Sequence, residues 1–112
     1  MNEKNNRWRI IIADAIIRVL DGNRCGEVKI VDFVGDVGDQ DADLNDPRNV
    51  TDVNLSAAWN YADSFCDAAM AGFSDVDGIE WQEATQLLHE VAIQLQNEQP
   101  ITNKLVLRYA RR

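Results

Sequence analysis

The strongest constraint on the fold is the apolar periodicity of residues 52–73. Apolar side chains recur there at helical spacing and form one stripe, made of Leu55, Ala58, Trp59, Ala62, Phe65, Cys66, Ala69 and Phe73. Asp63 and Asp67 belong to the opposite, polar face. Thr51 or Asp52 can cap the start of this helix, and Gly72 suits its end. A helix with one apolar face needs other elements to cover it.

Two elements precede this helix. Residues 7–21 predict an amphipathic helix, although the β-branched run Ile10–Ile12 leaves a strand beginning at Trp8 as a competitor. Residues 26–34 predict a strand with apolar side chains on both faces. Residues 35–50, with their glycines, proline and aspartates, predict an Asp-rich loop.

Two elements follow it. Asp77 and Glu80 resemble a capping box that opens a third helix, which runs to about Asn97. The apolar stripe of that helix comprises Trp81, Ala84, Leu88, Val91 and Leu95. Beyond Pro100, alternating apolar residues at 105–109 predict a final strand.

The order is helix, strand, helix, helix, strand. It predicts an α+β fold, in which a two- or three-stranded antiparallel sheet packs against amphipathic helices. With 112 residues, we expect a single domain over 1–112.

Charge is distributed unevenly within a formal net charge of -8. Residues 32–83 contain thirteen acids and one base, whereas 1–31 and 84–112 each carry a net charge of +2. Pairing the first strand with the last would place the basic ends on the side opposite the acidic region. The acidity also argues against direct binding of nucleic acid or of an anionic membrane.

The sequence shows no residue pattern typical of an enzyme active site or of a cofactor site. His89 is the only histidine, and Cys25 and Cys66 are 41 positions apart, so a zinc site is not expected. Asp39, Asp41 and Asp43 resemble the start of a calcium-binding EF-hand loop. Leu44 and Val50 break that motif where glycine and glutamate are required, which leaves a weak, irregular calcium site as an alternative.

The chain carries no feature of membrane insertion or export. Its longest apolar run, residues 10–13, is far shorter than the ~20 residues of a membrane helix. The polar N-terminus lacks a signal-peptide core, so we expect a cytoplasmic protein.

The remaining candidate is an acidic surface that binds a partner. Its predicted residues are Asp36, Asp39, Asp41, Asp43, Asp46, Asp63, Asp67, Asp75, Asp77, Glu80 and Glu83, with Tyr61 as an apolar contact off the stripe of its helix. A small fold with closely spaced carboxylates can occupy a basic groove in place of nucleic acid.

No stretch matches a family motif residue by residue. In size, acidity and lack of catalytic residues, the chain resembles the small acidic inhibitors of phages and mobile elements, the anti-CRISPR and anti-restriction proteins. It also resembles bacterial immunity proteins that neutralise a basic nuclease toxin. We therefore expect a non-enzymatic inhibitor that occupies the nucleic-acid-binding site of a basic protein. An immunity protein, a weak calcium-binding module and an oligomeric accessory protein remain alternatives, and a homodimer is possible.

Overall fold

A computed structural model describes residues 3–24 and 33–111, and it is mostly helical. In chain order the elements are α1 (Glu3–Arg24), α2 (Phe33–Gln40), the short 3-10 helices η1 (Ala42–Asn45) and η2 (Pro47–Asn49), α3 (Val53–Ala71), β1 (Asp75–Val76), β2 (Ile79–Glu80), α4 (Trp81–Gln96), α5 (Lys104–Leu107) and η3 (Arg108–Arg111). The two strands form a small antiparallel sheet, so the architecture is compatible with α+β.

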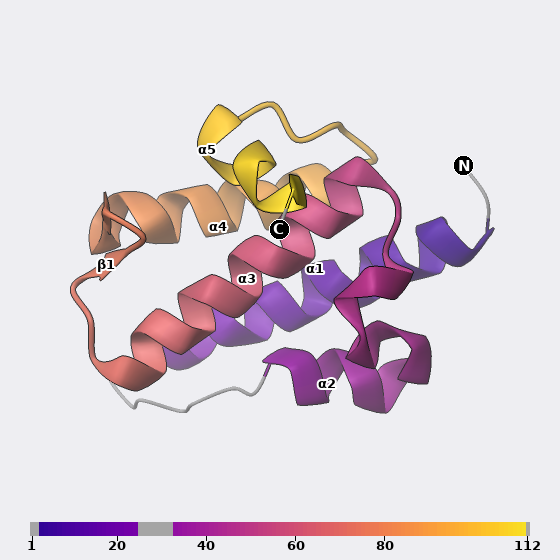
Figure 1. Cartoon of the computed structure of the whole chain (residues 1–112), viewed down its shortest axis with the longest axis horizontal. Coiled ribbons are helices and arrows are strands. Elements are labelled where there is room, and N and C mark those ends of the chain that lie inside the picture. Colours follow the sequence, from indigo (N-terminus) through magenta and orange to yellow (C-terminus); the bar gives the residue numbers. More distant parts are fainter. Residues whose placement is uncertain (1–2, 25–32, 112) are drawn as a thin grey trace.

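Three long helices hold the core (Figure 1). α1 packs against α4, α2 and α3, while α5 and η3 pack against α3. Ile12 and Ile16 of α1, Phe65 of α3, and Leu88 and Leu95 of α4 are fully enclosed. None of the helices within 3–24 and 33–111 has the length and apolar character required to cross a membrane.

The predicted helices are present, with shifted ends. The first helix covers residues 3–24, so the competing strand at Trp8 is wrong. Ile11 and Ile12 are buried while Ile10 is 51% exposed, which is the pattern of a helix with one covered face. The second predicted helix is α3. The Asp52 carboxylate caps it by accepting hydrogen bonds from the backbone N–H groups of Asn54 and Leu55.

The Asp-rich segment is not an irregular loop. We define the Asp-rich segment as residues 33–50, which fold into α2, η1 and η2. The carboxylates of Asp41 and Asp46 cap the two 3-10 helices by accepting from the backbone N–H groups of Asp43 and Arg48. Short aspartate side chains favour such caps, and this preference turns an apparent loop into successive helical turns.

Neither predicted strand is present in the described residues. Most of the strand at 26–34 falls on residues 25–32, outside the described part, and Phe33 and Val34 begin α2. The strand at 105–109 is wrong, because Asn103 caps α5 and the chain continues into η3. Val106 and Tyr109, three positions apart, are the buried residues, so the alternation at 105–109 conceals a helical spacing.

Candidate partner-binding surface

A tight hairpin joins α3 to α4 in place of the predicted capping box. β1 and β2 pair Val76 with Ile79 and Asp75 with Glu80. Asp77 (φ 53°) and Gly78 (φ 88°) both lie in the left-handed region, as the two central residues of a type I′ turn do. Glu80 precedes α4 without a side-chain capping bond, so the box prediction at Asp77 and Glu80 is wrong.

The end of α3 turns Phe73 out of the core. Gly72 adopts a left-handed conformation (φ 73°), its N–H donates to the Ala69 carbonyl oxygen (3.2 Å), and the Phe73 N–H donates to that of Ala68 (3.0 Å). These two bonds form a Schellman motif, which ends the helix. Phe73 is consequently 63% exposed, and its prediction as part of the core stripe is wrong.

Carboxylates gather around a hollow at this end of the molecule. The hollow has a volume of about 410 Å³ and is lined by Ser64, Asp67, Ala68, Phe73, Asp75, Asp77 and Gly78. We use the name hairpin face for Asp67, Phe73, Asp75, Asp77 and Glu80, all of which are exposed. The hairpin lies at one end of the long axis, where β1 is labelled in Figure 1.

Like charges oppose each other within the hairpin face. Asp75 and Glu80 are cross-strand partners, so their side chains emerge side by side on one face of the sheet. Among the residues that the structure describes, no lysine or arginine pairs with Asp67, Asp75 or Glu80. Neighbouring like charges destabilise a fold, so the hairpin face is suited to an opposite charge from outside.

The C-terminal segment, which comprises α5 and η3, contacts the hairpin through Tyr109. The Tyr109 hydroxyl donates to the Asp77 carboxylate, and the Tyr109 ring packs edge-on against Tyr61 with centroids 5.1 Å apart. Tyr61 was predicted as an exposed contact, but it is completely buried and its hydroxyl donates to the Ala84 carbonyl oxygen (2.7 Å). Burial raises the pKa of Tyr61 well above its usual range. Because α4 and η3 cover α3 on two sides, Tyr61 is a core residue and not a surface contact.

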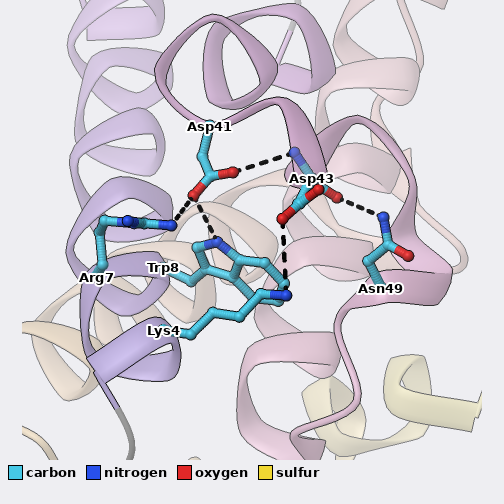
Figure 2. Close-up of polar contacts among 6 residues, drawn as sticks. All are labelled: Lys4, Arg7, Trp8, Asp41, Asp43 and Asn49. Carbon is cyan, nitrogen blue, oxygen red and sulfur yellow. Dashed lines mark hydrogen bonds and ion pairs between the residues drawn. The ribbon is translucent and has the colours of Figure 1, made fainter.

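Asp41, by contrast, is anchored against α1. Its carboxylate lies 2.5 Å from Arg7 Nη2 and accepts hydrogen bonds from Trp8 Nε1 (3.0 Å) and from the backbone N–H of Asp43 (3.1 Å), as Figure 2 shows. The hydrogen bond from Trp8 makes the largest contribution to lowering the pKa of Asp41, and the contacts with Asp43 and Arg7 add to it.

Basic residues neutralise most of the other carboxylates in the Asp-rich segment. Lys4 Nζ lies 3.7 Å from Asp43 and 4.6 Å from the Trp8 ring centroid. Arg18 Nη2 lies 2.7 Å from Asp36, and Arg48 Nη2 lies 2.6 Å from Asp46. The hydrogen bonds from Arg48 lower the pKa of Asp46. The expectation that the basic N-terminal region lies opposite the acidic segment is therefore wrong, because Lys4, Arg7 and Arg18 all belong to α1.

The other predicted site residues are dispersed. Asp39 and Glu83 are exposed, and Asp63 is half-buried on α3. His89 is exposed and Cys66 is buried, while Cys25 lies outside the described residues. In residues 3–24 and 33–111, no three histidine, cysteine or acidic side chains are arranged to hold a metal ion. Asp41 and Asp43, two residues of the proposed calcium motif, are instead engaged by different bases.

Comparison of the chain with protein-family models, with curated proteins and with solved structures found no match.

Sequence reasoning missed Phe73 as a surface residue. Its spacing from Ala69 fits the stripe of α3, but Gly72 stands directly before it. A glycine after the last helical residue is the usual signal that a helix ends. A second signal points to the unpaired acids of the hairpin face. The sequence has no lysine or arginine between Arg48 and Lys104, and this stretch includes the whole hairpin face.

Proposed function

We propose that this protein is a non-enzymatic binding protein whose hairpin face occupies a basic, nucleic-acid-binding site on a partner protein. The observation that carries the proposal is the contrast in charge pairing. Four carboxylates of the Asp-rich segment meet bases within the fold, whereas Asp67, Asp75 and Glu80 meet none among the described residues.

Electrostatics supports this function in two ways. A basic partner would relieve the repulsion between Asp75 and Glu80, which the free protein tolerates. Complementary fields also accelerate the encounter of two proteins and disfavour partners of the same charge. By covering a site that otherwise holds phosphates, the protein would act as an inhibitor of the anti-CRISPR or anti-restriction kind.

The test is affinity capture from a host lysate with two baits. One bait is the wild-type protein, and the other carries Asp67→Asn, Asp75→Asn and Glu80→Gln, which change charge at exposed positions. Captured proteins are eluted with short duplex DNA and identified by mass spectrometry. We expect a partner that the wild type retains, that the variant loses, and that DNA releases.

Two results would contradict the proposal. Equal retention by both baits would mean that the hairpin face is not the contact. A partner that resists displacement by DNA would mean that its nucleic-acid-binding site is not the surface covered. A partner that is itself a nuclease toxin would identify the protein as an immunity protein acting through the same face.

A further inference from the structure

Phe73 gives the hairpin face an aromatic centre. It is 63% exposed, more than any other large apolar side chain in the described residues, and its ring lines the hollow of about 410 Å³. Met70, near the same end of α3, is 54% exposed. Isolated apolar residues are ordinary on protein surfaces, but Phe73 lines a hollow that three carboxylates also line.

An aromatic ring next to carboxylates favours one kind of cationic side chain over another as its binding partner. An arginine guanidinium is planar and weakly hydrated, so it can stack on a ring and pair with carboxylates at the same time. A lysine ammonium is compact and strongly hydrated, and it gains less from the ring. The surface is therefore better matched to arginine than to an equal charge from lysine.

We propose that the hollow receives an arginine-bearing segment of the partner protein, with one guanidinium against Phe73 and near the carboxylates of Asp67 and Asp75. This inference rests on the proposed function and specifies the chemistry of the partner.

Charge decides against a second copy of this chain as the occupant. In a two-fold dimer through the hairpin face, the same patch of each copy would contact the other. Asp67, Asp75 and Glu80 would then face the same three carboxylates, and like charges in contact disfavour association. An arginine-bearing segment meets no such penalty.

The experiment compares two labelled peptides of equal charge, nona-arginine and nona-lysine, by fluorescence anisotropy against the full-length protein. The variants are Phe73→Ala and Phe73→Tyr, which keeps a ring. Val53→Ala is the matched control, because Val53 is 60% exposed at the opposite end of α3. Thermal melting verifies that each variant is folded.

We expect the wild type to bind nona-arginine roughly two- to five-fold more tightly than nona-lysine, the range that an exposed cation–π contact supplies. Phe73→Ala should abolish this preference, whereas Phe73→Tyr and Val53→Ala should keep it. A preference that survives in Phe73→Ala would overturn the inference.

The outcomes also separate this inference from the proposed function. Equal binding of the two peptides, weakening as salt rises, would overturn the arginine site and leave the basic partner in place. No binding of either peptide, even at about 50 mM salt where screening is weak, would overturn both.

Discussion

The Asp-rich segment and the hairpin face are both acidic, yet the fold treats them differently. In the Asp-rich segment, carboxylates cap short helices and meet Lys4, Arg7 and Arg18 of α1. In the hairpin face, Asp75 and Glu80 stand side by side, and no base pairs with either among the described residues. Figure 1 places the hairpin and the turns after α2 toward different ends of the molecule.

Local acid density alone does not show which carboxylates remain available to a partner. Five aspartates fall within residues 36–46, the densest cluster in the chain, and four of them are used within the fold. Asp46 meets Arg48 two residues away, but Asp36, Asp41 and Asp43 meet bases of α1 that are distant in the sequence. Only the tertiary structure reveals these three distant pairs.

The largest predicted effect distinguishes the two phenylalanines at the hairpin end. Phe65 is completely buried and stacks on Trp81 with ring centroids 4.5 Å apart, so Phe65→Ala should lower the free energy of unfolding by about 3–5 kcal/mol. Phe73→Ala removes the same atoms from an exposed position and should change it by less than about 0.5 kcal/mol. Urea denaturation measures both, and similar losses would show that Phe73 belongs to the core.

A smaller loss is expected in the Asp-rich segment. Asp41→Ala leaves the Trp8 indole N–H without its acceptor and removes a helix cap, so we expect a loss of about 1–3 kcal/mol. Asp39→Ala is the matched control, because Asp39 lies two residues before Asp41, is exposed and should be nearly neutral. Equal stability of the two variants would contradict a structural role for this segment.

The lowered pKa of Asp41 adds a dependence on pH. A carboxyl with a lower pKa in the folded state stabilises the fold fully above its unfolded pKa, which is near 4. This stabilisation disappears as the pH falls through the folded pKa. Chemical denaturation from about pH 6 down to pH 2 should therefore show a shallower acid loss in Asp41→Ala than in Asp39→Ala.

A still smaller effect is expected where the C-terminal segment holds the hairpin. Tyr109→Phe keeps the packing against Tyr61 but removes the hydroxyl that donates to Asp77, so it should cost about 1 kcal/mol. Hydrogen exchange should accelerate at residues 75–80 and remain unchanged at 42–49. Uniform acceleration over both regions would mean that Tyr109 supports the whole fold and not the hairpin.

Sequence patterns predicted the long helices because each has one apolar face and recognisable ends. Asp52 and Gly72 cap α3 as expected. At 105–109 the alternating apolar pattern led to a wrong strand prediction. Neighbouring residues there are apolar on more than one face, which hides the helical spacing of the buried residues Val106 and Tyr109. The Asp77–Gly78 pair is a strong hairpin signal, and it was obscured because Glu80 also fits a capping box.

Local acidity alone does not separate the exposed carboxylates of the candidate surface from ion-paired ones. Asp67, Asp75, Asp77 and Glu80 were named from local acidity and are exposed, but so were Asp36 and Asp41, which are ion-paired. Those pairs join residues 18 and 34 positions apart. No periodicity or local motif specifies which distant base will reach which acid.

The proposed contact through the hairpin face is tested most directly with two variants that each lose three charges. One carries Asp67→Asn, Asp75→Asn and Glu80→Gln in the hairpin face, and the other carries Asp36→Asn, Asp43→Asn and Asp46→Asn in the Asp-rich segment. Both variants reduce the net negative charge by the same three charges, so a difference between them reports the location of the contact. The association rate with the captured partner is measured by stopped flow at low and high salt.

We expect the hairpin variant to associate at least about ten-fold more slowly at low salt, with its melting temperature unchanged or slightly raised. The Asp-rich variant should associate at nearly the wild-type rate but melt at a lower temperature, because its carboxylates are already paired within the fold. If the Asp-rich variant associated slowly while the hairpin variant associated at the wild-type rate, the hairpin face would not be the contact.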